Sequence, residues 1–138
     1  MKKILFIIVA LFSANLTFAQ QLQKGNLFGV HVITVQLKPN ATMEQFTTFF
    51  VNQVLPEFEK HWDGLKGYLL KSARGEYKNS FAITWMFKTE AIRNKYFNAD
   101  DTPNDLEKAA WEKVKPIQKE LEKYGTYTVK YMDDWIVQ

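Results

Sequence analysis

The amino-acid sequence predicts a single α+β domain in which two helices cover one face of a four-stranded antiparallel sheet. Short runs rich in β-branched and aromatic residues alternate with two longer stretches whose apolar residues recur at helical spacing. Clusters of turn residues separate these runs, and no repeat or low-complexity linker divides the chain. The predicted order is β-α-β-β-α-β, which is the ferredoxin-like arrangement.

The first strand and the first helix are predicted in the first half of the chain. Residues 28–37 are rich in Val, Ile and Thr and end at a Lys-Pro-Asn turn, which indicates a strand. Thr42 is expected to cap a helix, with Gln45 in the capping-box position. Pro56 is expected to kink this helix or to end its regular part. The buried stripe is predicted to consist of residues at four-residue spacing: Phe46, Phe50, Val54 and Phe58.

Two further strands are predicted over residues 68–74 and 80–88, and the loop at residues 75–79 joins them as a hairpin. Thr89 is expected to open a short helical segment that ends near Asn98. These elements complete the central β-β part of the predicted order.

The second long helix is predicted to start at Thr102-Pro103, because proline is tolerated in a first helical turn, and to end at Gly125. A last strand is predicted over residues 126–132, followed by a tail of residues 133–138 that could clasp a partner chain. The apolar face of the helix is predicted to consist of Leu106, Ala110, Val114, Ile117 and Leu121.

Neither face of the predicted sheet is polar. In the third strand Phe81, Ile83, Trp85 and Phe87 share one side, and Ala82, Thr84 and Met86 share the other. A sheet with one face in water should alternate apolar with polar residues. The sequence therefore predicts that a second copy of the chain covers the face away from the helices, so that the protein is a homodimer.

Residues 1–19 are predicted to be a cleaved signal peptide. Lys2 and Lys3 precede an apolar run, and Thr17-Phe18-Ala19 places small residues before a cut at Gln20. The run breaks at Ser13, too early for a span of about 20 apolar residues, so no stable membrane anchor is expected. The mature domain, residues 20–138, is predicted to be periplasmic or secreted.

Composition excludes several classes of function. Loss of the two leader lysines lowers the formal net charge from +3 to +1, and no nucleic-acid partner is expected. The chain has no cysteine, which excludes disulfides, thiol catalysis and cysteine-bound metals. It also has no Gly-rich phosphate loop and no H-E-x-x-H motif, and no cofactor is expected.

Several segments carry a family resemblance. They are the strand end at residues 35–40, the helix with Leu55-Pro56, the Gly-Leu-Lys-Gly-Tyr-Leu-Leu segment at residues 64–70, and the strand-to-helix junction at residues 85–91. Together they resemble the dimeric α/β-barrel superfamily, close to antibiotic-biosynthesis-monooxygenase-like domains. The resemblance implies that two ferredoxin-like sheets pair into a barrel. Known members of this superfamily include cofactor-independent oxygenases, heme-degrading enzymes and isomerases.

The heme-degrading branch of that superfamily does not fit. Its pattern requires an asparagine on the first strand and a histidine on the helix after the third strand. Residues 28–37 contain no asparagine, and no histidine follows His61. Trp85 lies near the position of a tryptophan in that branch, but one tryptophan does not carry the function. Heme degradation is rejected.

His31 is the candidate catalytic residue, because it is the only ionisable group central to a predicted strand. Near neutral pH it could exchange a proton with a bound substrate, or it could be a neutral core histidine. The residues expected to line a pocket are Tyr68, Trp85 and Met86. The predicted function is binding of a small apolar or aromatic ligand, with or without an oxygenase-like or isomerase-like activity. The alternative is a non-catalytic structural or accessory dimer of an exported complex.

Glu57 and His61 are four residues apart on the first helix, with Asp63 nearby, and this spacing suits metal ligands. Further ligands are not identifiable in the sequence. A solvated Glu–His pair is the simpler interpretation, and no metal site is predicted.

Overall fold

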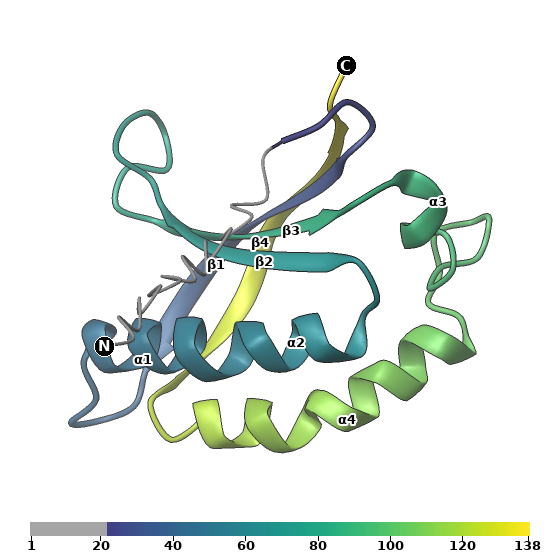
Figure 1. Ribbon diagram of the computed structural model, residues 1–138. Helices are drawn as coiled ribbons and strands as arrows, with labels where there is room; N and C mark the ends of the chain where they lie inside the picture. Colours follow the sequence, from purple (N-terminus) through teal and green to yellow (C-terminus); the bar gives the residue numbers. More distant parts are fainter. Residues whose placement is uncertain (1–21) are drawn as a thin grey trace, which may run out of the picture.

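The computed structural model describes residues 22–138, so the predicted signal peptide lies outside the described residues. The chain forms a four-stranded antiparallel sheet in the order β2-β3-β1-β4. Figure 1 shows α1, α2 and α4 on one side of this sheet and α3 at one end of it. The predicted ferredoxin-like fold is confirmed. The elements are β1 (Leu27–Leu37), α1 (Met43–Phe49), the π-helical turn η1 (Phe50–Val54), α2 (Leu55–His61), β2 (Leu65–Lys71), β3 (Phe81–Phe87), α3 (Glu90–Arg93), α4 (Asp105–Leu121) and β4 (Gly125–Ile136).

The register of the sheet decides which side chains face the helices. Leu27 pairs with Phe87 on one side of β1 and with Ile136 on the other. Because side chains alternate along a strand, the odd-numbered residues of β1 face the helices and the even-numbered residues face away. A β-bulge opposite Val32 and Ile33 leaves Lys130 as an extra residue in β4. The bulge therefore shifts the alternation of the end of β4 by one residue.

The first helical segment runs through α1, η1 and α2 without a break. Its start is the predicted capping box, in which the Gln45 amide N–H donates to the Thr42 hydroxyl at 3.2 Å and the Thr42 N–H donates to the Gln45 side chain at 2.9 Å. Pro56 does not end the helical segment, and a π-helical turn precedes it, with the Leu55 N–H donating to the Phe50 carbonyl. Pro56 then lies in the first turn of α2, directly after the π-helical turn that accommodates its missing N–H.

The helical stripe predicted from the sequence forms the centre of the core. Phe46, Phe50 and Val54 are fully buried, and Phe58 is nearly so. They pack beneath the sheet with Ile33 and other apolar residues of its helix-facing side. Burial of each such side chain contributes about 1.5–3 kcal/mol. The hydrophobic effect therefore joins this helix to the sheet.

The structure corrects several predicted boundaries near the first helix. The second strand starts at Leu65 rather than Tyr68, because Gly64 adopts a positive φ of 69° and turns the chain directly after α2. The helical segment after Thr89 is a single turn, Glu90–Arg93, although Thr89 caps it as expected.

No helix among residues 22–138 is long and apolar enough to cross a membrane.

The last helix begins later than predicted, but most of its predicted apolar face is confirmed: Ala110, Val114 and Leu121 are buried, and Ile117 packs against the core. Asn104, not Thr102, is its cap, because its side chain accepts hydrogen bonds from the backbone N–H groups of the first turn. Pro103 instead forms an isolated bridge with Phe97. Leu106, predicted as buried, is 51% exposed, and Glu107 beside it is 5% exposed. Leu106 is therefore the residue of the predicted face that is wrong, and Glu107 is buried in its place.

The chain after α4 also differs from the prediction. Gly125 does not end the helix, which stops at Leu121, but is the first residue of β4. A Cβ at Gly125 would lie 2.7 Å from the Gln36 carbonyl oxygen, so the two backbones approach as only glycine allows. Residues 133–136, predicted as a tail, extend β4.

Gly67→Ala is expected to destabilise the fold. A Cβ at this position would lie 2.6 Å from Trp85 Cζ3 and 2.8 Å from Leu55 Cδ2. Overpacking of this kind costs about 1–3 kcal/mol. Urea denaturation should show this loss, whereas the exposed Gln36→Ala should change stability by less than about 0.5 kcal/mol. Equal stability of Gly67→Ala and the unmodified protein would contradict the packing described.

Candidate functional site

A cavity of about 480 Å³ opens between the helix-facing side of the sheet and the helices α2 and α4. A second cavity of about 440 Å³ shares His31, Phe58, Trp85 and Trp111 with it. The aromatic residues that line the first cavity are Phe58, Trp62, Trp85, Phe87, Phe97 and Trp111. The polar residues that line it are His31, Arg93, Asp101, Glu107, Asp133 and Asp134.

Four of the aromatic rings form two walls at right angles. Phe58 stacks on Trp62 with ring centroids 5.1 Å apart and on Trp85 at 4.8 Å. The Trp111 ring meets Phe58 at 86° and Trp62 at 87°, both edge to face. Such pairs are each worth about 0.5–1.5 kcal/mol beyond their buried area, so this corner of the cavity is rigid.

His31 lies on β1 in the cavity wall, between Ile83 of β3 and Met132 of β4. Its neighbour Gly29 makes room for it, because a Cβ at Gly29 would lie 3.0 Å from both His31 Nε2 and Asp134 Oδ1. Burial lowers the pKa of His31, and the negative charge of Asp134 opposes this effect in part. At neutral pH the imidazole is therefore neutral and able to accept a proton.

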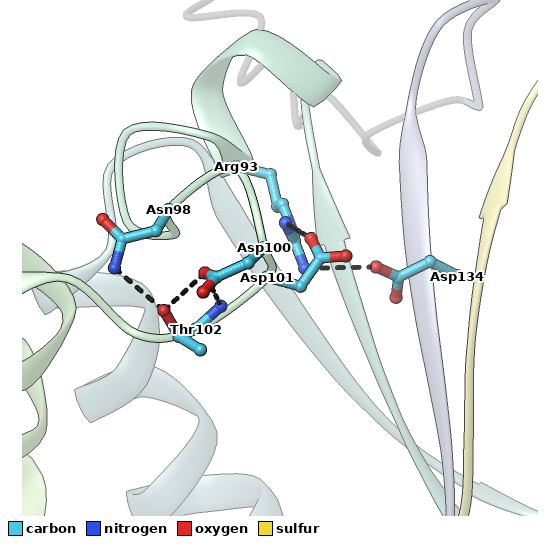
Figure 2. Close-up of polar contacts among 6 residues, drawn as sticks. All are labelled: Arg93, Asn98, Asp100, Asp101, Thr102 and Asp134. Atoms are coloured by element: carbon cyan, nitrogen blue, oxygen red, sulfur yellow. Dashed lines mark hydrogen bonds and ion pairs between the residues drawn. The ribbon is translucent and has the colours of Figure 1, made fainter.

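Arg93 holds the carboxylates at one end of the cavity. Its Nη1 donates to Asp101 Oδ1 at 2.6 Å, and its Nη2 lies 3.7 Å from Asp134 Oδ2, as Figure 2 shows. The guanidinium also lies 4.2 Å from the centre of the Phe97 ring. Only 15% of the Arg93 side chain is exposed, whereas 75% of the Asp101 side chain and 43% of the Asp134 side chain are exposed. Arg93 thereby fixes the position of Asp134 beside His31.

The loop that carries Asp101 is shaped by a local hydrogen-bond network. The Thr102 amide N–H and hydroxyl both donate to Asp100 Oδ1, at 3.1 and 2.6 Å, and Asn98 donates to the Thr102 hydroxyl (Figure 2). These hydrogen bonds lower the pKa of Asp100. Asp101 has a positive φ of 63°, a conformation that aspartate tolerates better than most residues. The turn directs the Asp101 carboxylate toward Arg93.

Glu107 is the buried carboxyl group of the cavity. Its residue is 5% exposed, and burial raises its pKa, while a hydrogen bond with the Trp111 side chain and the positive charge of Lys108 oppose that rise. A buried carboxylate costs free energy unless it is paired. Glu107 is therefore a buried titratable group of the cavity wall and a candidate site residue.

The structure brings together two of the four residues named from the sequence. His31 and Trp85 line the same cavity. Tyr68 and Met86 occupy positions that alternate with those of the helix-facing residues, so they lie on the other face of the sheet. Met86 is fully buried there.

Sequence reasoning missed Arg93, Glu107, Trp111 and Asp134 as site residues. Asp134 was assigned to a tail, and Glu107 lay off the predicted apolar face of its helix. A buried acidic residue leaves no periodic pattern of its own. The one available signal was the i, i+4 spacing of Glu107 and Trp111, which places both on one side of α4.

The Glu57–His61 pair forms outside this cavity. Glu57 Oε1 lies 2.9 Å from His61 Nε2, and this hydrogen bond is the main cause of the lowered pKa of Glu57. Asp63 is largely exposed and pairs with Lys95 at 3.7 Å. Within residues 22–138, no three His, Asp or Glu side chains are grouped so that they could hold a metal ion.

No protein-family model and no curated protein match the chain. Among solved structures, it is similar to a dimeric protein of unknown function and ferredoxin-like fold from Bacteroides fragilis NCTC 9343. The two share 11% sequence identity with a TM-score of 0.33, over 82% of this chain and 97% of that chain.

The stability of the protein is expected to fall as the pH drops below about 6.5, the ordinary pKa of histidine. The folded pKa of His31 is lowered, so the unfolded chain binds a proton first, and protonation favours unfolding until the pH passes the folded pKa. His31→Gln should show a smaller loss of unfolding free energy between pH 7.5 and pH 5.5 in urea titrations. The same pH slope in both proteins would show that His31 is not desolvated.

Proposed function

We propose that this chain is an exported homodimer that binds a small aromatic ligand in the cavity and exchanges a proton with it through His31. The observation that carries the proposal is the cavity of about 480 Å³, lined by six aromatic residues with a histidine in its wall. Small-molecule sites are typically about 300–1,000 Å³ and apolar, with a few polar groups that orient the ligand.

The shape of the aromatic walls supports a planar ligand. Trp111 stands perpendicular to Phe58 and Trp62. A flat ligand ring could therefore stack on one of these two walls while its edge contacts the other wall. Aliphatic walls would bury a ligand of any shape equally well. The cavity therefore favours a flat ring system.

The polar end of the cavity supports proton transfer. A neutral imidazole can accept a proton from an acidic O–H or C–H group of a ligand, and the Asp134 carboxylate stabilises the imidazolium that forms. Arg93 keeps that carboxylate in place. Transfer of a proton is the chemistry of an isomerase-like reaction, which the resemblance to the dimeric α/β-barrel superfamily also implies.

Binding is tested with the mature protein and two probes, indole and 2-naphthol, by tryptophan fluorescence and thermal shift. A ligand at 100 times its Kd should stabilise the fold by about 2.7 kcal/mol. Trp111→Leu should weaken binding by at least about 10-fold, because one ring wall is lost. Leu106→Ala, on the exposed side of the same helix, should leave binding unchanged.

The His31→Gln variant tests whether the protein is an enzyme or only binds a ligand. It should retain 2-naphthol binding within a few-fold, while proton exchange at the ring carbon next to the hydroxyl, followed by NMR in D₂O, should fall by at least about 100-fold. Unchanged exchange would remove His31 from the chemistry. Absence of binding by any aromatic probe would favour the alternative, a structural or accessory dimer.

The sheet face away from the helices supports the homodimer. On this face Leu70 is 47% and Trp135 is 59% exposed, at opposite edges of the sheet. Phe28, Val30 and Tyr68 on the same face are partly exposed. Apolar surface of this kind is stabilised when another apolar surface covers it. A second copy with the same face supplies that surface by two-fold symmetry.

Light scattering is expected to give a dimer mass for the mature protein at micromolar concentration. Trp135→Glu should shift it toward monomer, because a charge would be buried in the interface. Leu106→Glu, on α4 and away from this face, is the control and should remain a dimer. A monomeric unmodified protein would overturn the proposed assembly.

Export is proposed from residues 1–19 alone. Their order of lysines, apolar run and small residues matches a cleavable signal peptide. The exported protein should begin at Gln20 when its mass is measured by mass spectrometry. Ile7→Lys, which breaks the apolar run, should keep the protein in the cytoplasm at full length. Export of the Ile7→Lys protein would contradict the signal-peptide assignment.

A further inference from the structure

We propose that the ligand of this cavity is an organic cation, an aromatic compound whose ammonium group lies against Glu107 and the tryptophan ring atoms that face the cavity. This inference rests on the proposed function and adds the charge of the ligand to it. Charge balance, a buried carboxyl group without an ion pair and the aromatic lining of the cavity support it.

The charged side chains that line the cavity are mainly acidic. Arg93 is their single cation, whereas Asp101, Asp134 and Glu107 are carboxyl groups. Asp133 also lines the cavity but pairs with Val30 on the other face of the sheet, and its charge is not counted. The guanidinium of Arg93 already contacts two of these carboxylates, Asp101 at 2.6 Å and Asp134 at 3.7 Å. An anionic ligand would therefore have to displace an existing ion pair, while a cationic ligand meets an excess of negative charge.

Glu107 is the buried acid that would contact the cation. Among residues 22–138 it forms no ion pair with a lysine or arginine, although Arg93 lines the same cavity. Its contact with the Trp111 side chain is a hydrogen bond to an uncharged group. A carboxylate removed from water without a counter-ion is unfavourable, and a bound ammonium group would relieve this cost.

The tryptophan rings suit a cation as well as a flat ring. A positive charge is attracted to the face of an aromatic ring, and tryptophan is the strongest partner. Trp62 and Trp111 are in edge-to-face contact, at 87° with centroids 6.0 Å apart, so an ammonium group would lie against the ring atoms that face the cavity and not between the two rings. Glu107 lies one helical turn from Trp111 on α4 and lines the same cavity. Aromatic walls with an adjacent carboxylate are the chemistry that recognises alkylammonium groups.

The test compares three probes that share a phenyl ring and differ in charge: phenethylamine, 2-phenylethanol and 3-phenylpropanoate. Calorimetric titration of the mature protein at pH 7.5 should give phenethylamine a Kd at least about 10-fold lower than that of the alcohol, which is about 1.4 kcal/mol. The carboxylate should bind most weakly. The preference for the amine should decrease as salt is added.

Glu107→Gln should weaken phenethylamine binding by at least about 10-fold and leave 2-phenylethanol within about two-fold. Because burial raises the pKa of Glu107, its charge opposes folding at pH 7.5, so the Gln protein should be at least as stable as the unmodified one. Glu112→Gln is the matched control, since Glu112 lies on α4 with an exposed side chain paired to Lys115. It should change neither affinity.

The outcomes distinguish the two proposals. If the alcohol binds as tightly as the amine, the cation inference is wrong and the proposed aromatic site remains. If none of the three probes binds, the site itself is wrong. If Glu107→Gln weakens both ligands equally, Glu107 has only a structural role and the inference is overturned. Should that variant not fold, Trp111→Phe must reduce the preference for the amine over the alcohol, and an unchanged preference overturns the inference.

Discussion

The stack of Trp62, Phe58 and Trp85 is the contact on which both the fold and the cavity depend. Phe58 and Trp62 come from the end of the first helical segment, and Trp85 comes from the strand beneath it, so the stack joins helix to sheet. Gly67, which pairs with Trp85, is small enough to let the indole ring lie flat on its strand. The same rings form one wall of the cavity. A substitution that loosens the core therefore also changes the ligand site.

Around this rigid wall the chain places groups that do not help it to fold. His31 is partly desolvated and loses basicity, and Glu107 is a buried acid whose pKa is raised. Each would be more favourable in water. A domain of this size has only a modest margin of stability, so two such groups in one cavity indicate that the cavity has a use. Arg93 limits the cost at one end by pairing with two carboxylates.

Much of the architecture could be predicted because local patterns determine it. The buried stripe of the first helix, its capping box and the alternation along the third strand all depend on residues a few positions apart. Pro56 was expected to kink or end the first helix, and the π-helical turn before it was not predicted. Boundaries were less predictable. Thr102-Pro103 has a helix-start pattern, but Pro103 pairs with Phe97, and a tertiary contact moved the cap to Asn104. Glu107 is buried in place of Leu106, although Ala110, Val114 and Leu121 are buried as predicted.

The sequence by itself determined the element order, the two apolar faces of the sheet and the presence of a histidine at the centre of the first strand. The tertiary structure alone decided which side chains meet that histidine. One extra residue in the last strand, at the β-bulge, turns Asp134 rather than Asp133 toward the helix side, and Arg93 reaches it from another element. These side-chain contacts depend on the register of the strands and on segments far apart in the chain. The spacing of residues along the sequence specifies neither the register nor the distant partner.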